Sequence, residues 1–375
     1  MKTTMQVTAY PVHDERNREL HIDANTRERL HSPEFPILPG DVDLRALLVS
    51  TVSLGFSTSD GLLYCGLTSF DQDILDTFDI DAKTFRSMRF GQIADRFDVK
   101  IHRSLQFDSR GVIYMAIAGL SDVDELQMAP GGKIVRYDPS TRTFEVLGIP
   151  LAHNYIQTIV LDDRRGIIYG CTYPVPHAFR FDIATRQSKD LGFINSMPHS
   201  PGLDDEGNLW TTWTPLGRTW NNLMRYNPDT DETTWTRVAL PAICADDTGA
   251  VDAFVNGGDG FLYIGTTAGA LLRLDPRTIE VEYLCHPTPG PRIAGLIVGK
   301  DGLLYGSAGT HGNTHLFSYD RSTERATLLG PIYDPERKTS NWTTHALCEP
   351  RAGLFYVGET DNPNRSGFLW ECRVY

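Results

Sequence analysis

The chain has 375 residues, 41% of them hydrophobic and 22% charged, and its 35 basic and 48 acidic residues give a net charge of −13. No apolar run approaches the roughly 20 residues that a membrane-spanning helix needs, which excludes a helical membrane protein. The negative balance argues against a nucleic-acid-binding protein, whose binding surface is a basic stripe. It is compatible with a local basic pocket for an anionic ligand.

The beginning of the chain predicts a strand and no export signal. The segment MKTTMQVTAYPVHDE lacks the apolar stretch that forms the centre of a signal peptide. We therefore expect a cytoplasmic protein, or a secreted or periplasmic one if a signal peptide has been removed. None of the six cysteines forms a CxxC pair, so we expect reduced cysteines.

One short pattern recurs along the chain: a turn glycine, a short apolar stretch and an aromatic residue. Its seven copies are Gly61–Tyr64, Gly111–Tyr114, Gly166–Tyr169, Gly207–Trp210, Gly260–Tyr263, Gly302–Tyr305 and Gly353–Tyr356. The glycines are 50, 55, 41, 53, 42 and 51 residues apart, which is the period of β-propeller blades.

Each copy lies in the same frame of four short strands. An apolar segment comes first and is followed by a polar turn such as Asp60-Gly61, which is typical of a hairpin. The glycine–aromatic strand follows, then a third strand that ends in a turn such as DPST or DPRT, and then a weaker fourth strand. Four antiparallel strands in each of seven units predict an all-β, seven-bladed propeller.

The two ends of the chain predict how the ring closes. The seventh unit stops after its third strand, in the final residues GFLWECRVY. Residues 5–12 have the pattern of a strand without a hairpin partner, and we expect them to supply the missing outer strand of the last blade and cover its edge. The expected organisation is a closing strand and crossing segment in residues 1–46 and a propeller in residues 47–375, within a single domain.

The alternation of strand directions places most histidines on one face. The first strand of each blade lines the channel, and its start lies on the same face as the end of the second strand, opposite the Asp-Gly turns. Eight of the eleven histidines fall at such positions: His102, His153, His177, His199, His286, His311, His315 and His345.

Polar residues at equivalent strand starts are expected to ring the mouth of the channel, where ligands of ring-shaped β folds bind. These residues are His102, Gln157, His199, Asp252 and His345. Histidine exchanges protons near neutral pH, which makes His102 and His199 candidates for acid–base chemistry. The structural alternative for each is a channel histidine bound to backbone or water.

Further candidates lie on the same predicted face. Tyr173 stands where the repeat elsewhere has small residues, and a tyrosine with a shifted pKa can exchange a proton. Trp213 and Trp220 could be flat surfaces for sugar rings, and Arg218 and Arg292 could bind an anion. Their structural alternatives are packed aromatic residues and solvated loop charges. His311 and His315, in the loop sequence GTHGNTH, are possible metal ligands, although the spacing indicates a metal site only weakly outside a helix.

With its seven repeats and a face rich in His, Tyr and Arg, the chain resembles the seven-bladed propeller polysaccharide lyases, which include ulvan, oligogalacturonate and rhamnose–glucuronate lyases. The repeat itself is also shared with streptogramin lyase-like and gluconolactonase-like propellers. The lyase resemblance implies β-elimination next to a uronate carboxylate. It implies His102 or His199 as the base, Tyr173 or His153 as the acid and Arg218 as the group that neutralises the carboxylate. Substrate contacts would come from Trp213, Trp220, Gln157, His345 and Arg292.

We therefore expect a carbon–oxygen lyase that acts on an anionic oligo- or polysaccharide, as a monomer without nucleic-acid or membrane partners. No cofactor is certain, and a divalent ion such as Mn²⁺, Ca²⁺ or Zn²⁺ is possible. One alternative is a propeller glycoside hydrolase or a metal-dependent lactonase. The other is a non-enzymatic binding propeller.

Overall fold

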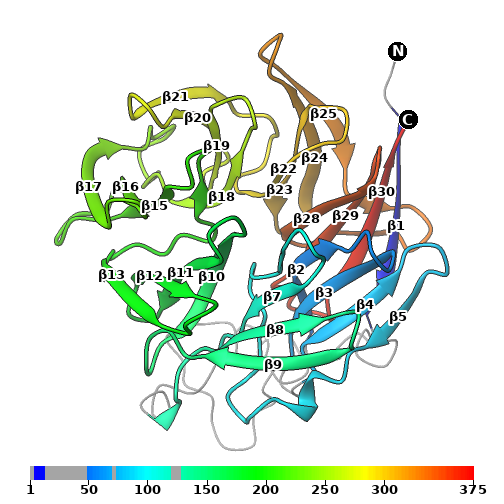
Figure 1. Ribbon diagram of the computed structural model, residues 1–375. Helices are drawn as coiled ribbons and strands as arrows, with labels where there is room; N and C mark the ends of the chain where they lie inside the picture. Colours follow the sequence, from blue (N-terminus) through cyan, green and yellow to red (C-terminus); the bar gives the residue numbers. More distant parts are fainter. Residues whose placement is uncertain (1–3, 13–48, 70–72, 120–127) are drawn as a thin grey trace, which may run out of the picture.

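The computed structural model describes residues 4–12, 49–69, 73–119 and 128–375. The described residues form an all-β ring of seven four-stranded sheets (Figure 1), which confirms the expected seven-bladed propeller. One single-turn 3₁₀ helix, η1 (Phe90–Gln92), is the only helix among them. In this described part of the chain no helix has the length and hydrophobicity of a membrane span. The predicted crossing segment lies almost entirely outside the described residues.

The strands follow the repeat. The first three blades contain β2 (Ser50–Phe56), β3 (Leu62–Thr68), β4 (Leu75–Asp79), β5 (Thr84–Ser87); β6 (Gln106–Phe107), β7 (Ile113–Ala116), β8 (Ile134–Asp138), β9 (Thr143–Gly148); and β10 (Tyr155–Asp162), β11 (Ile167–Tyr173), β12 (His177–Asp182), β13 (Ser188–Phe193). The next three contain β14 (Gly202–Leu203), β15 (Leu209–Trp213), β16 (Asn222–Asn227), β17 (Glu232–Ala239); β18 (Val251–Asn256), β19 (Leu262–Thr266), β20 (Leu271–Asp275), β21 (Glu280–Cys285); and β22 (Ile293–Val298), β23 (Leu304–Thr310), β24 (Asn313–Asp320), β25 (Arg325–Pro331). A short hairpin, β26 (Tyr333–Asp334) and β27 (Thr339–Ser340), precedes the last blade, which contains β28 (Thr344–Arg351), β29 (Leu354–Glu359), β30 (Phe368–Val374) and β1 (Met5–Pro11).

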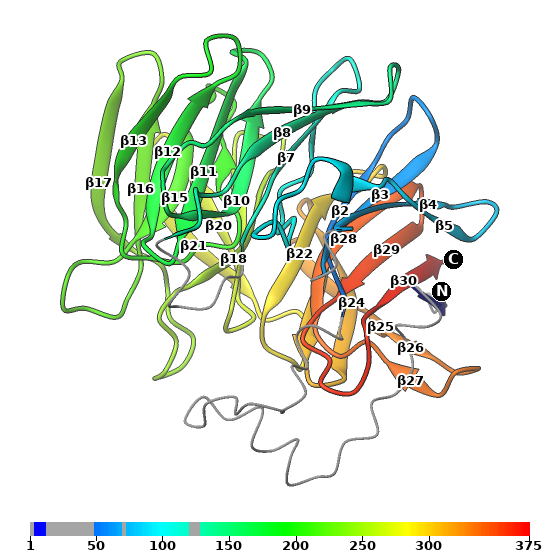
Figure 2. The same ribbon diagram turned by 90° about the horizontal axis from the view of Figure 1, so that it is seen from below.

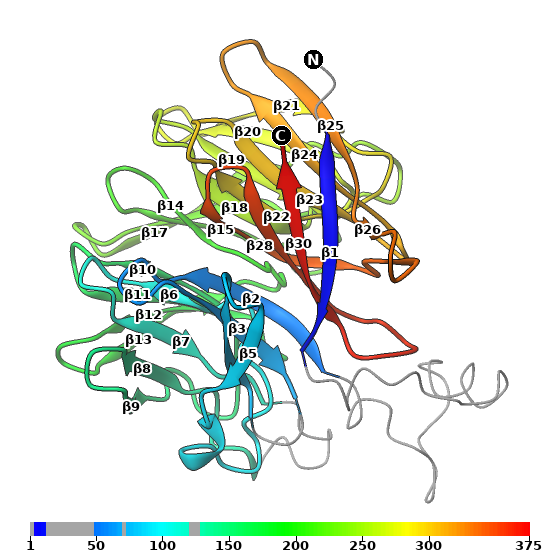
Figure 3. The ribbon, with the colours of Figure 1, turned by 90° about the vertical axis from the view of Figure 1, so that its right-hand side faces the viewer.

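The N-terminal strand closes the ring as expected. β1 runs antiparallel to β30, with Met5 opposite Val374 and Pro11 opposite Phe368, and Figure 3 shows the two strands side by side. Val7 and Ala9 on β1 are buried in the hydrophobic core of the last blade. The free edge that the chain's last strand would otherwise expose is therefore covered.

The hydrophobic core lies between blades rather than at the centre of the ring. Neighbouring blades pack face to face, as Figure 2 shows for β10–β13 and β14–β17. Among the described residues, seven clusters of buried side chains fill the seven interfaces between neighbouring blades. The blades converge toward the axis, which explains why small residues follow the aromatic one: a Cβ on Gly265 would lie 2.6 Å from Ile293 of the next blade.

The repeated Asp-Gly turn is stabilised by its own aspartate. Asp60 accepts hydrogen bonds from the backbone N–H of Leu62 (3.1 Å) and from the hydroxyl of Tyr64 (2.7 Å). Asp259 with Tyr263 and Asp301 with Tyr305 repeat this arrangement. The spacing of the motif therefore reflects a turn that ties its aspartate to the strand that follows.

The inner strands carry bulges where they begin. The first strands of neighbouring blades contact one another around the channel. In five of them one extra residue interrupts the pairing with the second strand, at Val52, Gln157, Asp252, Ala294 and the His345–Ala346 pair. A bulge frees backbone groups from the ladder and re-aims side chains, and bulges are frequent next to active sites.

Candidate functional site

One connected polar network joins the beginnings of all seven inner strands. We call it the channel cluster; its members are Val52, His102, Arg103, Gln157, His199, Asp252, Arg292 and His345. Val52, Gln157, Asp252 and His345 are bulge residues, and the others lie in the segments that lead into β6, β14 and β22. The cluster exists only because the ring brings seven distant segments together.

Asp252 is the negative centre of the channel cluster and is fully buried. Its Oδ2 accepts a hydrogen bond from Nε of Arg292 at 2.6 Å. Its Oδ1 lies 3.1 Å from the guanidinium of Arg103 and 3.3 Å from Nδ1 of His199, at angles that do not form good hydrogen bonds. The two arginines hold the pKa of Asp252 below its usual range against the opposing effect of burial, so this carboxylate is charged.

His199 places one ring nitrogen beside the Asp252 carboxylate. Asp252 faces its Nδ1, which favours the tautomer with the proton on Nδ1 and leaves a lone pair on Nε2. Among the described residues, Nε2 has no hydrogen-bond partner. The side chain is 16% exposed. Catalytic hydrogen bonds are often long in a protein without substrate and shorten when substrate binds, which fits the 3.3 Å separation.

His102 and His345 are buried and face each other. Their Nε2 atoms are 2.9 Å apart. Nδ1 of His102 lies 2.7 Å from the carbonyl oxygen of Gln157, and Nδ1 of His345 lies 2.8 Å from that of Val52. Both carbonyls belong to bulge residues. A bulge interrupts the pairing between strands, so these carbonyls are free to accept hydrogen bonds from side chains.

Burial keeps the three histidines neutral. It lowers the pKa of His199 to about 3 and those of His102 and His345 well below the ordinary value. The nearby positive charges of Lys100 and Arg103 lower these pKa values further. At neutral pH, therefore, the site contains neutral imidazoles beside fixed cations.

Lys100 adds a third cation at the mouth. It lies on an extended segment bridged to Thr68 and Ala118, and Ile101 next to it is buried in the core. Because side chains alternate along an extended chain, Lys100 and His102 point to the same side, toward the channel. Burial lowers the pKa of Lys100 to about 8, partly offset by the charge of Asp361.

A small cavity lies deeper in the channel, beneath the cluster. It has a volume of about 140 Å³ and is lined by Arg103, His345 and Gln106 together with small and apolar residues.

The structure brings together six of the residues selected from the sequence: His102, His199, His345, Gln157, Asp252 and Arg292. Gln157 takes part through its backbone carbonyl. Arg103 and Lys100 were missed. The sequence signal for both was their position in KIHR, directly beside His102 at a strand start.

The other two acid–base candidates make contacts elsewhere. His153 is exposed and bonds the carbonyl of Ala129 at 2.9 Å. Tyr173 is exposed at the end of β11, where its ring lies 5.1 Å from that of Tyr155.

Three of the predicted substrate-contacting residues, Arg218, Trp213 and Trp220, make their contacts outside the cluster. Arg218 stacks on Trp220, with the guanidinium carbon 5.0 Å from the ring centre, and both side chains are exposed. Trp213 donates its indole N–H to the carbonyl of Thr236 and packs edge-on against Trp235.

The predicted metal pair makes no metal-binding set. His311 contacts the hydroxyl of Thr310 and the ring of Trp342. Nδ1 of His315 is buried and has no hydrogen-bond partner within the described ranges. Across the described residues, no three His, Cys, Asp or Glu side chains gather closely enough to hold a metal ion. All six cysteines are free, as expected.

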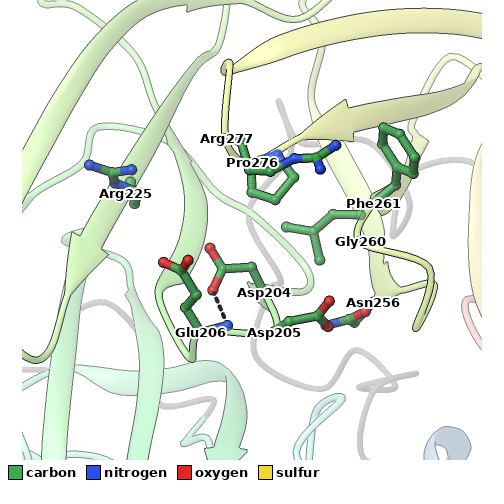
Figure 4. A pocket seen from close by; sticks show the side chains of 10 residues that line it. Asp204, Asp205, Glu206, Arg225, Asn256, Gly260, Phe261, Pro276 and Arg277 are labelled. Atoms are coloured by element: carbon green, nitrogen blue, oxygen red, sulfur yellow. Dashed lines mark hydrogen bonds between the residues drawn. The ribbon is translucent and has the colours of Figure 1, made fainter.

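A larger hollow of about 430 Å³ lies at the opposite end of the inner strands, between the blades of β14–β17 and β18–β21 (Figure 4). Asp204 in its lining stabilises the local turn and strand. It accepts hydrogen bonds from the side chains of Asn208 (2.9 Å) and Trp210 (2.8 Å) and from the backbone N–H of Glu206. Arg277 forms an ion pair with Asp275. This hollow contains no histidine, and the channel cluster remains the better candidate site.

The fold and cluster define a seven-bladed β-propeller with a polar, cation-rich channel mouth. No family model and no curated protein matches the sequence. Solved structures do resemble it. A catalytically inactive virginiamycin B lyase from Staphylococcus aureus, determined with quinupristin, covers 99% of this chain and 100% of its own, with a TM-score of 0.66 and 12% identity.

Two further structures extend the likeness. A streptogramin B lyase covers 87% of this chain and 93% of its own, with a TM-score of 0.63 and 14% identity. The extracellular domain of what is described as a hybrid two-component system from B. thetaiotaomicron aligns with a TM-score of 0.58 and 14% identity, over 86% of this chain and 38% of the other. At these identities the comparisons establish the fold.

Proposed function

We propose that the protein is a carbon–oxygen lyase that cleaves an anionic substrate by β-elimination at the channel mouth, with uronate-containing saccharides as the substrate class. The observation that carries the proposal is the neutral His199 imidazole, backed by Asp252 and surrounded by Arg103, Arg292 and Lys100. Such a site combines a base with fixed positive charge. Similarity of fold to two structures described as lyases adds support.

His199 is the proposed base. Its free Nε2 would take the proton from the carbon next to the substrate carboxylate, and the electron pair of that C–H bond would form the new C=C bond. Burial, together with the neighbouring positive charges, holds the pKa of His199 near 3. A bound carboxylate would offset those charges, so the imidazole would become more basic once substrate is present. Asp252 would stabilise the imidazolium that forms.

The cations would bind the carboxylate and stabilise the charge that develops on it. Arg292 is 17% exposed and Lys100 is half-buried, so both can reach a ligand at the mouth. Fixed charges in a site shielded from water stabilise an enolate-like transition state strongly, since they need no reorganisation.

Lys100 is also the proposed proton donor. With a pKa of about 8 its ammonium group is charged at neutral pH yet close to the range where proton transfer is efficient. The C–O bond would break as Lys100 delivers a proton to the leaving oxygen. Solvent would then return His199 and Lys100 to their starting states.

The test is an ultraviolet assay for the unsaturated product, applied to a panel of uronate glycans. Quinupristin should be included because it accompanies one of the similar structures. The expected result is product from at least one uronate glycan, abolished in His199→Ala and retained in His153→Ala. Product from quinupristin alone would replace the uronate substrate class, and no product from any compound would contradict the lyase proposal.

A further inference from the structure

The His102–His345 pair makes more contacts than two neutral imidazoles can satisfy. Each Nδ1 faces a carbonyl oxygen, of Gln157 or Val52, and can form a hydrogen bond only if it carries a hydrogen. The two Nε2 atoms, 2.9 Å apart, require a hydrogen between them. These three contacts need three hydrogens, whereas two neutral imidazoles carry two.

In the neutral pair, one of these three contacts is therefore unfavourable. The position of Arg103 determines which contact that is. Nε of Arg103 lies 3.4 Å from Nδ1 of His345, so His345 can accept there and donate from Nε2 to His102. His102 then donates from Nδ1 to Gln157, for which the described residues offer no alternative donor. In this arrangement the lone pair of His345 Nδ1 faces the carbonyl of Val52 at 2.8 Å, which is repulsive.

One added proton resolves the conflict at the carbonyl of Val52 without moving an atom, but it gives up the longer contact with Arg103, whose Nε–H then faces an N–H of His345. With a hydrogen on both Nδ1 atoms and one shared between the Nε2 atoms, all three contacts become hydrogen bonds, two of them strengthened by charge. The opposing effects are burial and the positive charges facing the pair. The charged and titratable groups around it are Lys100, Arg103, His199, Asp252 and Arg292, with Asp361 acting on Lys100 and Arg292.

An anion at the mouth would shift this balance. It would neutralise part of the charge of Lys100 and Arg292, which otherwise opposes protonation of the pair. We propose that the channel mouth binds a carboxylate together with a proton, and that the His102–His345 pair is the proton's binding site. This rests on the proposed function for the location of the anion, and it assigns the buried histidine pair a role separate from that of the base.

The experiment is calorimetric titration of the full chain with galacturonate in two buffers of different ionisation enthalpy, near neutral pH. Uncharged galactose is the matched control ligand. We expect uptake of about one proton for each galacturonate bound and none with galactose, by the linkage between binding and protonation. Nitrogen NMR of ¹⁵N-histidine-labelled protein should show one additional protonated imidazole in the complex.

Two variants test the assignment. His345→Asn keeps a donor near the carbonyl of Val52 but has no Nε2, and it should bind galacturonate with proton uptake close to zero. His177→Asn removes a histidine that pairs with Asp190 outside the cluster, and it should keep the uptake of the unmodified protein. Uptake that persists in His345→Asn, uptake absent from the unmodified protein, or failure to bind galacturonate would each overturn the proposal.

These outcomes differ from those of the lyase test. Proton uptake with galacturonate but no product from any glycan would contradict the elimination and leave the coupled binding intact. Product formation without proton uptake would contradict the coupled binding and leave the elimination intact.

Discussion

Two buried carboxylates, Glu359 and Asp252, show how differently the same pairing with arginine can be built. Both lie within one residue of an end of a strand near the channel, and both are fully buried. Glu359 receives six hydrogen bonds at 2.7 to 3.1 Å from five residues: Trp342, Asn362, Arg365, Phe368 and Trp370. Asp252 has one short bond to Arg292, while its other oxygen faces two poorly aligned partners.

The difference indicates two roles. A fully satisfied buried network is rigid and specifies one conformation, as expected for Glu359, which ties the loop 360–367 to the last blade. Incompletely satisfied buried groups need an explanation, and a site awaiting a ligand is one. Glu359 and Arg365 lie on the face that the sequence pointed to, yet their bonds are complete within the protein.

The largest expected effect is the loss of activity when His199, beside Asp252, is replaced. His199→Ala should reduce kcat in the elimination assay about 10²–10⁴-fold, since a positioned base contributes that much. The urea-unfolding midpoint should change little, because the His199 side chain makes one loose polar contact with the described residues. Unchanged kcat would remove His199 from the mechanism.

A substitution at Glu359 should instead lower stability and leave activity unchanged. Glu359→Gln leaves the Arg365 guanidinium buried without its counter-charge, which costs about 3–5 kcal/mol of unfolding free energy. Urea titration measures the loss. The folded fraction should retain the kcat of the unmodified protein, and a specific loss of kcat without destabilisation would reverse the roles assigned to the two carboxylates.

Arg292 should affect both rate and pH dependence. Arg292→Met should lower kcat/KM about 10²–10³-fold by removing a charge that stabilises the transition state. The charge of Arg292 also lowers the pKa of His199, so its removal raises that pKa and moves the acidic limb of the kcat/KM profile to higher pH. Arg218→Met, at an exposed residue stacked on Trp220, is the control. A stronger effect at Arg218 would favour the assignment made from the sequence.

Acid stability should depend on His199. Its pKa is lowered from 6.5 to about 3 by folding, so the unfolded chain binds the proton more tightly. The stabilisation is fully present above pH 6.5 and is lost progressively as the pH falls toward 3. His199→Asn should flatten this dependence in urea titrations between those pH values. An unchanged slope would show that His199 is not the group responsible.

The smallest expected effect is on stability, at the hydrogen bond between the aspartate and the tyrosine of the repeated turn. Tyr263→Phe removes a hydrogen bond of 3.0 Å to Asp259 and should cost about 0.5–1.5 kcal/mol in unfolding free energy. Tyr169 is a matched control, because its buried hydroxyl has no hydrogen-bond partner in the described part of the chain and Arg165 stands four residues earlier, where Asp259 stands relative to Tyr263. Tyr169→Phe should be neutral or stabilising. Equal losses at both sites would contradict the role of the Asp–Tyr bond.

Much of the fold was accessible from sequence because propeller blades are local. Each blade is built from consecutive strands, and the turn aspartate and aromatic residue that stabilise it are only four residues apart, as in Asp60 and Tyr64. The missing strand at the C-terminus and the unpaired strand at the N-terminus left one way to close the ring. Counting strand starts was enough to select His102, His199, Asp252 and His345.

The sequence by itself thus determined the number of blades, the closure by β1 and the face on which polar residues collect, because these follow from local periodicity. Only the tertiary structure decided which of those residues meet. It joined Arg103 to Asp252 across 149 positions and His102 to His345 across 243, and it sent Arg218 and Tyr173 elsewhere. The reason is physical: bulges and ring closure set the direction of each side chain at the axis, and neither leaves a repeating signal in the sequence.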